Sequence, residues 1–332
     1  MLDLSPTGGA SDGPSIAFID LAPGPQGFRA AALEGLSQPA KSIPCRFLYD
    51  AAGSALFDRI CELEEYYPTR AETEILTDRA AEIARRVGPD AELIELGSGS
   101  SIKVRILLDA LQRPSAYVAV DISAEHLRAA AEALAADYPQ VKVAAVCADY
   151  ARPFRLPRLH GAGRRVGFFP GSTIGNLTPE EAEEFLAAWA DRLGPGAAMI
   201  VGVDLKKDAA ILNLAYDDPK GVTAAFSLNL LARANRELGA DFDLDAFAHD
   251  ARYDPDKGRV EIHIQSLVLQ SVRVAGRTFP FEAGERIHTE YSYKYALDEF
   301  ADLARRSGFQ PETAWTDSRG LFSVHLLTTP AG

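Results

Sequence analysis

Short, uninterrupted runs of apolar residues alternate with segments of helical periodicity through the middle of the chain. The apolar runs lie at residues 91–96, 117–120, 141–147, 166–169 and 197–203. Apolar residues at three- and four-residue spacing indicate helices at residues 102–111, 124–137 and 179–192. Strands that are apolar on both faces and joined by helices are typical of parallel sheets, because a parallel pair needs a long crossover connection. The pattern therefore predicts an α/β fold with a doubly wound, mostly parallel sheet.

The pattern differs on both sides of this central region. Upstream, Leu56, Ile60 and Leu63 recur at helical spacing, and residues 71–87 continue without Gly or Pro. Downstream, the predicted helices lie at residues 207–215, 222–238 and 297–306, and the predicted strands at residues 259–274, 285–295 and 322–328. These flanking segments predict a second, smaller α+β domain that covers a ligand cleft beside the sheet.

The chain is accordingly divided into five parts. Residues 1–26, rich in Gly, Pro and Ser, are expected to form a flexible arm. Residues 27–90 form the N-terminal helical part of the substrate domain, and residues 91–205 form the cofactor-binding core. Residues 206–296 are a substrate-binding insertion, and residues 297–332 return to the core as a helix and a strand.

Composition narrows the possible partners. The chain of 332 residues has 34 Lys and Arg against 47 Asp and Glu, a formal net charge of -13, so it lacks the excess positive charge that favours nucleic-acid binding. No apolar run is long enough to span a membrane, and the N-terminus has no basic segment followed by an apolar one. We therefore expect a cytoplasmic protein that binds neither nucleic acid nor membrane.

The cysteines and histidines do not indicate a metal or a disulfide framework. Cys45, Cys61 and Cys147 are odd in number and widely spaced, which favours reduced structural thiols. No histidine lies at metal-ligand spacing from a second His or Cys. We expect no metal.

A glycine-rich turn follows the first predicted strand of the core. Gly97, Ser98 and Gly99 lie where that strand ends and a helix begins, so that backbone N–H groups and the helix N-terminus can approach a ligand closely. Ile102 stands where a dinucleotide fingerprint requires a third glycine. The turn alone is weak evidence, and a structural turn is the alternative.

Polar residues at the ends of the next two strands strengthen the interpretation. Asp121 ends the second strand, where a carboxylate can accept hydrogen bonds from both ribose hydroxyls. Asp149 and Tyr150 end the third strand, where an acid can hold an adenine amino group and a ring can stack on the base. Acids in this order favour S-adenosylmethionine over NAD as the cofactor.

Several stretches together resemble the L-histidine Nα-methyltransferase family of ergothioneine biosynthesis, whose members trimethylate histidine to hercynine. They are FLYD at 47–50, EYYPTR at 65–70, ELGSGSS at 95–101, GSTIGNL at 171–177, AYDD at 215–218, NRELGADFD at 235–243 and TEYS at 289–292. The resemblance spans residues 41–325 in the family's order and implies a class I methyltransferase, Rossmann-like core.

The resemblance implies roles for residues outside the glycine turn. Asn176 resembles the asparagine that holds the amino and carboxylate groups of the substrate, and Tyr216 resembles a tyrosine that also binds the carboxylate. Tyr49 resembles a tyrosine near the substrate amine, so Tyr49 and Asn176 are the candidate catalytic residues. Gly171 lies at a turn whose backbone can approach the cofactor or the substrate.

The imidazole pocket is implied by a second group of residues. Glu290 and Ser292 resemble the pair that hydrogen-bonds the histidine side chain, and two residues apart on a strand they share a face. Tyr66 resembles a further tyrosine on that ring. Ile262 stands where the family usually has methionine, so a stiffer, branched side chain reshapes the pocket wall. The alternative for Glu290 and Ser292 is a solvent-facing pair on an antiparallel strand.

Cofactor contacts carry over in the same way. The resemblance implies that Gly97 approaches the methionine part or the ribose, Asp121 holds the ribose and Asp149 the adenine. Lys103 matches a lysine near the cofactor, although a solvated helix lysine is an equal alternative. Tyr150 stands where the family usually has phenylalanine.

The leading hypothesis is an S-adenosylmethionine-dependent enzyme that trimethylates the amino group of L-histidine. Another aromatic amino acid, such as tryptophan or a derivative, is the alternative because Ile262 departs from the family pattern. A cofactor-binding module without activity and an NAD-dependent dehydrogenase are alternatives from other classes. The expected partner is a small molecule, the amino acid L-histidine, and the expected oligomeric state is a monomer.

Overall fold

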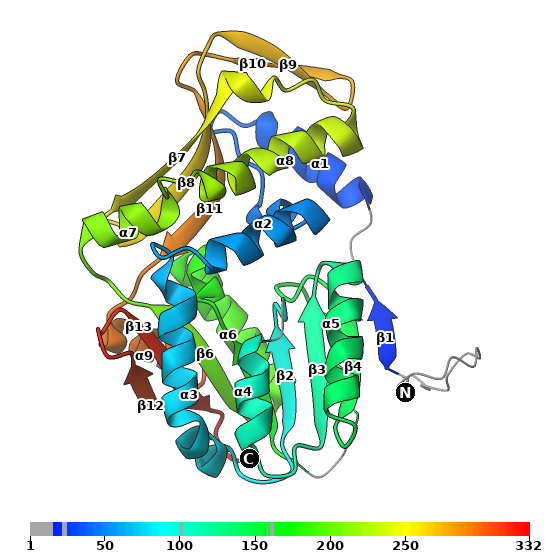
Figure 1. Cartoon of the computed structure of the whole chain (residues 1–332), viewed down its shortest axis with the longest axis vertical. Helices are drawn as coiled ribbons and strands as arrows, with labels where there is room; N and C mark the ends of the chain where they lie inside the picture. The colour runs from blue at the N-terminus through cyan, green and yellow to red at the C-terminus, as the bar shows by residue number, and fades with distance from the viewer. Residues whose placement is uncertain (1–15, 22–24, 100–101, 158, 160–162) are drawn as a thin grey trace.

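The computed structural model describes residues 16–21, 25–99, 102–157, 159 and 163–332. It has two domains stacked along its long axis (Figure 1). A domain built on a large sheet forms the lower part of Figure 1, and a smaller α+β domain stands above it. The carboxyl ends of strands β2 (Glu92–Leu96) and β3 (Ala116–Asp121) point toward the smaller domain. Ligand sites in open α/β sheets lie at this edge.

The large sheet has the strand order β1-β4-β3-β2-β5-β6-β13-β12. Its other strands are β1 (Ala17–Asp20), β4 (Lys142–Cys147), β5 (Arg165–Phe169), β6 (Ala198–Asp204), β12 (Gln310–Thr316) and β13 (Phe322–Thr328). Neighbours from β1 to β6 are parallel, whereas β13 pairs antiparallel with β6 and with β12. The order reverses between β2 and β5, which confirms the predicted doubly wound sheet.

Helices cover both faces of this sheet because the central strands carry apolar side chains on both faces. Leu93 of β2 packs in the cluster that also contains residues of α3 (Tyr67–Val87), α4 (Ile102–Ala110) and α5 (Ala124–Asp137). The next residue, Ile94, packs in the opposite cluster. Residues of two helices contribute to that cluster, α6 (Pro179–Leu193) and α9 (Leu297–Arg306).

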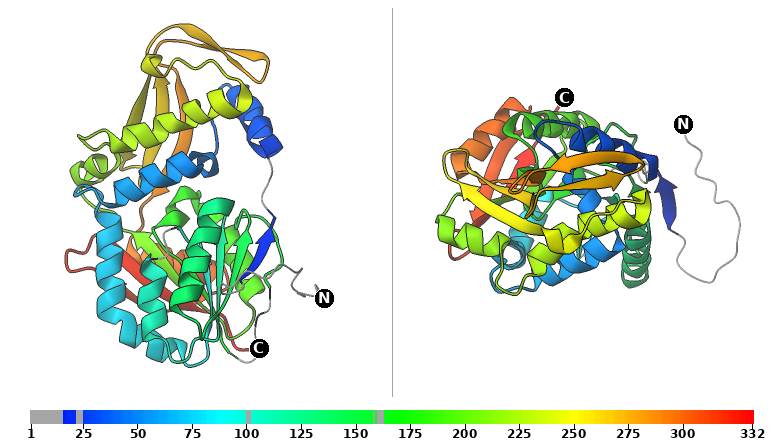
Figure 2. Two further views of the ribbon diagram at one scale, coloured as in Figure 1. Left: turned by 45° about the vertical axis from the view of Figure 1, so that its right-hand side comes forward. Right: turned by 90° about the horizontal axis from the view of Figure 1, so that it is seen from above.

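The smaller domain has its own apolar core and its own sheets. A three-stranded antiparallel sheet, β11-β8-β7, lies beside a two-stranded sheet, β10-β9 (Figure 2). The strands are β7 (Phe247–Asp254), β8 (Arg259–Ser266), β9 (Gln270–Val274), β10 (Arg277–Phe281) and β11 (Arg286–Tyr293). The helices are α1 (Pro25–Leu36), α2 (Ala51–Cys61), α7 (Ala209–Tyr216) and α8 (Val222–Leu238). The core contains Phe226 and Leu230 of α8 together with Ile264 of β8, which confirms a second α+β domain.

Two expectations about the domain division are wrong at the N-terminal side. Residues 17–20, placed in the flexible arm, form β1 and pair in parallel with β4. Helix α3, placed in the substrate domain, packs its apolar side on the large sheet through Ile75 and Leu76. Helical periodicity indicates that a face is buried, but not which of two cores buries it. Residues 1–15 and 22–24 of the arm lie outside the described residues.

Several strands have no counterpart among the predicted elements. Strand β7 carries His249, Asp250 and Arg252 among its apolar residues, and β12 is an edge strand whose alternate residues are exposed. The predicted strand at 259–274 is divided into β8 and β9 at residues 267–269. Such polar strands are stabilised by pairing with their neighbours, a contribution that local sequence does not contain.

Candidate active site

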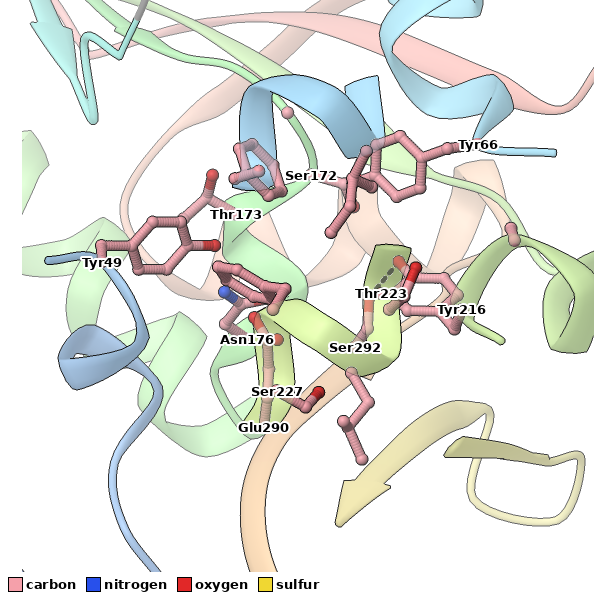
Figure 3. Close-up of a pocket in the computed structure, with 16 residues that line it drawn as sticks. Tyr49, Tyr66, Ser172, Thr173, Asn176, Tyr216, Thr223, Ser227, Glu290 and Ser292 are labelled. Carbon is pink, nitrogen blue, oxygen red and sulfur yellow. Dashed lines mark hydrogen bonds between the residues drawn. The ribbon is translucent and has the colours of Figure 1, made fainter. Parts of the chain in front are cut away.

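A pocket lies between the two domains, beneath α2 and α8 and beside β11 (Figure 3). It encloses about 600 Å³, part of it open to solvent. All eight residues predicted to bind the substrate line it: Tyr49, Tyr66, Gly171, Asn176, Tyr216, Ile262, Glu290 and Ser292. These residues come from both domains and lie up to about 240 positions apart, so only folding brings them together.

The direction of Glu290 depends on an irregularity in β11. In the register with β8, His288 is opposite His263 but Glu290 is opposite Ile262, so Thr289 is an extra residue. Such a bulge changes the face to which the following residues point. Glu290 and Ser292 therefore share the face of Ile262, as predicted from their spacing, and they point into the pocket (Figure 3). The solvent-facing alternative is wrong.

Glu290 is an unusual acid because it lies half-buried in the pocket wall. Burial raises its pKa to about 7, although Lys294 and a hydrogen bond from the Asn176 side chain oppose the shift. Asn176 belongs to the short 3₁₀ helix Thr173–Asn176 that follows β5. The carboxyl group of Glu290 thus lies near its titration point at neutral pH, and a ring N–H or a cation would stabilise its charged form.

Aromatic rings form the opposite wall. The ring of Tyr49 packs edge-on against Phe57 at 5.6 Å and against Phe226 at 5.4 Å, and the ring of Tyr66 lies 6.1 Å from that of Tyr216. Burial and the nearby Glu290 carboxyl raise the pKa of Tyr49 well above 10. Tyr49 is therefore a neutral hydrogen-bonding group and an aromatic face at neutral pH, not a base.

A buried ionic network lies directly behind two pocket residues. The Lys294 ammonium donates to the Tyr216 hydroxyl and to the Ser292 hydroxyl, each at 2.7 Å. It also pairs with Asp204 at 2.7 Å, and the side chains of Lys294 and Asp204 are both fully buried. Burial opposes ionisation of Asp204, but Lys294 and Lys207 outweigh that effect and lower its pKa. Lys294 was not predicted as a site residue, because a lysine directly after a strand as polar as β11 gives no sign in the sequence that it is buried.

The glycine turn lies at the carboxyl end of β2, near the pocket. Gly97 has φ +75° and Gly99 φ +44°, conformations that glycine adopts without strain. A Cβ at Gly97 would meet nothing closer than the Tyr150 ring at 3.8 Å, and the buried Ser98 hydroxyl has no hydrogen-bond partner among the described residues. The turn thus presents open backbone and a free hydroxyl, as a bound cofactor requires. Ser100 and Ser101 lie outside the described residues.

The predicted strand-end acids lie at the same edge of the sheet. Asp121 accepts hydrogen bonds from the backbone N–H of Gly99 at 3.4 Å and of Ser123 at 2.9 Å. Burial raises the pKa of Asp121, so hydroxyl donors from a ribose would stabilise its charged form. Asp149 lies 3.5 Å from the Arg152 guanidinium, and the Tyr150 ring packs edge-on against Phe169 at 5.6 Å. Asp121, Asp149 and Tyr150 thus lie together at the edge of the sheet where the sequence predicts the cofactor.

Comparison with known proteins decides the family. The model of the family described as histidine-specific methyltransferase, SAM-dependent, matches residues 28–329. The chain belongs to this family. It is 44% identical to the histidine N-alpha-methyltransferase of Mycolicibacterium smegmatis over 297 residues, 88% of this chain and 92% of the relative. It is also 44% identical to the enzyme of that name from Mycobacterium tuberculosis over 303 residues, 90% of this chain and 94% of the relative.

A more distant relative has a different substrate in its name. The 4-dimethylallyltryptophan N-methyltransferase of Aspergillus fumigatus is 28% identical over 302 residues, 86% of this chain and 88% of the relative. The chain is thus an S-adenosylmethionine-dependent methyltransferase with a class I, Rossmann-like core. The module without activity and the dehydrogenase lose their support.

In this methyltransferase, Lys103 links the region of the glycine turn to the pocket residue Gly171. Its ammonium binds the Glu72 carboxylate at 2.5 Å, and the same carboxylate accepts the Gly171 backbone N–H at 2.8 Å. Lys103 thus points inward from α4 and is not a solvated helix lysine. Glu72, fully buried, was not predicted, although an acid on the apolar side of a helix is a usable signal.

Two acids in the family motifs are structural in this methyltransferase. Asp50 caps α2 by accepting the Gly53 N–H at 2.8 Å, and it also accepts the Asn229 amide at 2.8 Å, which fixes α2 against α8. Asp218 accepts the N–H groups of Val222 and Thr223 at the start of α8. Both acids hold the aromatic wall of the pocket in place.

Other features of the described residues bear on the remaining expectations. None of the helices that the structure describes is long and apolar enough to cross a membrane. The three cysteines are free, and Cys147 is buried in the sheet. Within the described ranges, no three His, Cys, Asp or Glu side chains gather closely enough to hold a metal ion.

Proposed function

We propose that this methyltransferase transfers methyl groups from S-adenosylmethionine to the α-amino group of L-histidine, three times in succession, and releases hercynine. The observation that carries the proposal is the convergence of Glu290, Ser292, Tyr216 and Asn176 on one pocket beside the glycine turn. An acid and a hydroxyl suit the imidazole, and a tyrosine and an amide suit the amino acid head group. The sequences of the mycobacterial histidine N-alpha-methyltransferases support the same substrate.

Binding and positioning supply most of the proposed catalysis. When bound, the cofactor supplies an electrophilic methyl group on a sulfonium, and transfer breaks its C–S bond and forms a C–N bond. The amine needs a free lone pair and an approach of about 3–3.5 Å in line with the breaking bond. Asn176 and Tyr49 are neutral, so they hold the amine without favouring its protonated form, and the released proton passes to solvent.

Successive transfers require room for a growing cation. The rings of Tyr49, Phe57 and Phe226 pack against one another and line the same pocket as Asn176. Aromatic faces attract quaternary ammonium groups, at about 0.5–2 kcal/mol per contact. The aromatic wall therefore suits a mono-, di- and trimethylated amine in turn.

The proposal is tested by incubating the enzyme with labelled cofactor and each of the twenty amino acids, followed by mass spectrometry of the products. We expect label in histidine only and a final product carrying three added methyl groups. Transfer to a different amino acid would refute the substrate, and a product that stops at one or two methyl groups would refute trimethylation.

Ile262 favours a second candidate, the Nα-methylation of a different aromatic amino acid. Ile262 lies opposite Glu290 on β8 and lines the pocket, so it contacts the side chain of any bound amino acid. An apolar change of this size alters discrimination by about 1–3 kcal/mol, less than the loss of a buried polar partner. Competition between histidine and tryptophan in one reaction separates the two candidates.

A further inference from the structure

The ammonium of Lys294 lies outside the pocket and yet controls two hydroxyls that line it. Its three N–H groups are all used, on Asp204, the Tyr216 hydroxyl and the Ser292 hydroxyl, each at 2.7 Å. The ammonium also lies 4.6 Å from the centre of the Tyr216 ring. With its side chain fully buried and bonded to three oxygens, Lys294 has no freedom to rotate away.

Lys294 remains charged in this position. Burial alone would lower its pKa, but Asp204 outweighs that effect and the pKa of Lys294 is raised. Asp204 has further partners, because it also pairs with Lys207 at 2.6 Å and accepts from the Tyr67 hydroxyl at 2.8 Å. Two ammonium groups thus share the Asp204 carboxylate, and Asp317 also acts on Lys207, so Lys294 is the ammonium that lies behind the pocket hydroxyls.

The hydroxyls of Tyr216 and Ser292 are also 2.7 Å from each other. Each oxygen accepts a proton from Lys294, so each can only donate its own proton elsewhere. One of the two protons lies between the oxygens, and the other points into the pocket. The pair therefore has two arrangements: either Tyr216 or Ser292 donates into the pocket, but not both.

A substrate carboxylate selects one arrangement. If Tyr216 faces that carboxylate, it must donate, since a lone pair would repel the anion. Ser292 then donates to Tyr216 and presents a lone pair to the substrate side chain. We infer that Lys294 is a positioning residue that makes Ser292 a hydrogen-bond acceptor, so that the pocket selects amino acids with a ring N–H directed at Ser292. This inference rests on the proposed function.

The position of the Lys294 ammonium has a second consequence for the same ligand. A carboxylate bound at Tyr216 lies on the pocket side of the two hydroxyls, with the Lys294 ammonium directly behind them. Because this environment is buried, the attraction between opposite charges is weakly screened. Lys294 should therefore strengthen the binding of every α-amino acid, in addition to its effect on the choice of side chain.

A matched pair of variants tests the inference. Lys294→Met and Lys207→Met each remove one ammonium from Asp204, but only Lys294 contacts the two pocket hydroxyls. Histidine binding is measured by calorimetry on the intact enzyme loaded with S-adenosylhomocysteine, together with KM and kcat. We expect Lys294→Met to weaken histidine binding about 10- to 100-fold and Lys207→Met less than about 3-fold, with cofactor binding unchanged in both.

Selectivity gives the readout that a structural role would not move. L-β-(thiazol-4-yl)alanine has the shape of histidine but no ring N–H. In the wild type it should bind much more weakly than histidine, and that ratio should shrink in Lys294→Met but not in Lys207→Met. Equal ratios in the two variants, or equal losses of histidine binding, would overturn the inference.

Two further variants keep the test decisive if Lys294→Met does not fold. Tyr216→Phe should weaken histidine and thiazolylalanine by the same factor, because it removes the donor to their common carboxylate. Ser292→Ala should weaken histidine alone. The reverse pattern would contradict the assignment of acceptor and donor. The activity of the wild type tests the proposed function separately. If the wild-type enzyme does not methylate histidine, the proposed function is refuted whatever the variants show.

Discussion

The cofactor half and the substrate half of the site are built in different ways. Gly97, Asp121 and Asp149 each lie at the carboxyl end of a parallel strand, so the sheet alone brings them to one edge. Glu290 and Tyr216 instead come from a bulged strand and a helix end in the smaller domain. The sheet edge is set by regular geometry, whereas the pocket depends on irregular features and on one domain packing over the other.

This difference has a consequence for the effects of substitutions. Groups on the sheet edge should affect the cofactor and leave amino acid binding unchanged, and groups on the smaller domain should do the opposite. The Glu72 carboxylate bridges the halves through Lys103 and Gly171, so it should affect both.

Glu290→Ala is expected to produce the largest difference between the effect on histidine binding and the effect on cofactor binding. The change removes the half-buried acid that we propose binds the imidazole, and polar pockets strongly reject ligands whose partner is missing. We expect the KM for histidine to rise about 100-fold or more, with the dissociation constant of S-adenosylmethionine within about twofold of the wild type. Comparable loss of both ligands would contradict the separation, and Glu290→Gln serves as the conservative control.

The opposite separation is expected from Asp121→Asn. An amide accepts fewer hydrogen bonds than a carboxylate and also donates, so it fits two ribose hydroxyls poorly. Cofactor binding should weaken about 10- to 50-fold. Histidine binding, measured on enzyme saturated with cofactor, should not change. Isothermal titration with each ligand in turn gives both numbers.

A joint effect is expected from Gly202→Ala in β6. A Cβ there would lie 2.0 Å from the Glu72 carboxylate oxygen, which is held by Lys103 and Gly171 and cannot move freely. Such overpacking costs about 1–3 kcal/mol of unfolding free energy. Thermal unfolding should record the loss, and binding of both ligands should weaken together. Gly167→Ala in the neighbouring strand β5 is the control, because a Cβ there would press on the Leu193 and Met199 side chains at 3.2 Å and would not touch Glu72.

The pH dependence of stability offers a finer test on the substrate half. Burial raises the pKa of Glu290 to about 7 from its ordinary value of 4.5. The folded protein then binds more protons than the unfolded chain between those values, so the contribution of Glu290 to stability falls as the pH rises through this window. Glu290→Gln should raise the stability of the ligand-free enzyme at pH 8 by about 1–3 kcal/mol and have little effect at pH 4.5. Denaturant unfolding at both pH values measures the difference, and an equal gain at both would contradict the shifted pKa.

The smallest change is expected from Ile262→Met. Both side chains are apolar and similar in volume, and methionine adapts more easily to a ligand. The ratio of kcat/KM for histidine over tryptophan should shift by less than about 10-fold, with cofactor binding unchanged. A larger shift would show that the pocket wall, and not the polar pair, dominates the choice of substrate.

The doubly wound sheet, the glycine turn and the strand-end acids could all be predicted from the amino-acid sequence. Each depends on local periodicity or on a residue directly after a strand, and parallel topology then places them at one edge. The family motifs also identified the pocket residues, including Glu290 and Ser292, since their order along the chain is read without a structure.

How these residues act depends on contacts that form only in the folded protein. The bulge at Thr289, the bridge from Glu72 to Lys103 and Gly171, and the Lys294 network all join segments far apart in sequence. The buried charges of Glu72 and Lys294 are stable only because each has a specific partner of opposite charge. Local sequence does not show which distant residue that partner is. The chain therefore encodes the chemical groups of the site locally, and the packing of its two domains sets their direction, charge and partners.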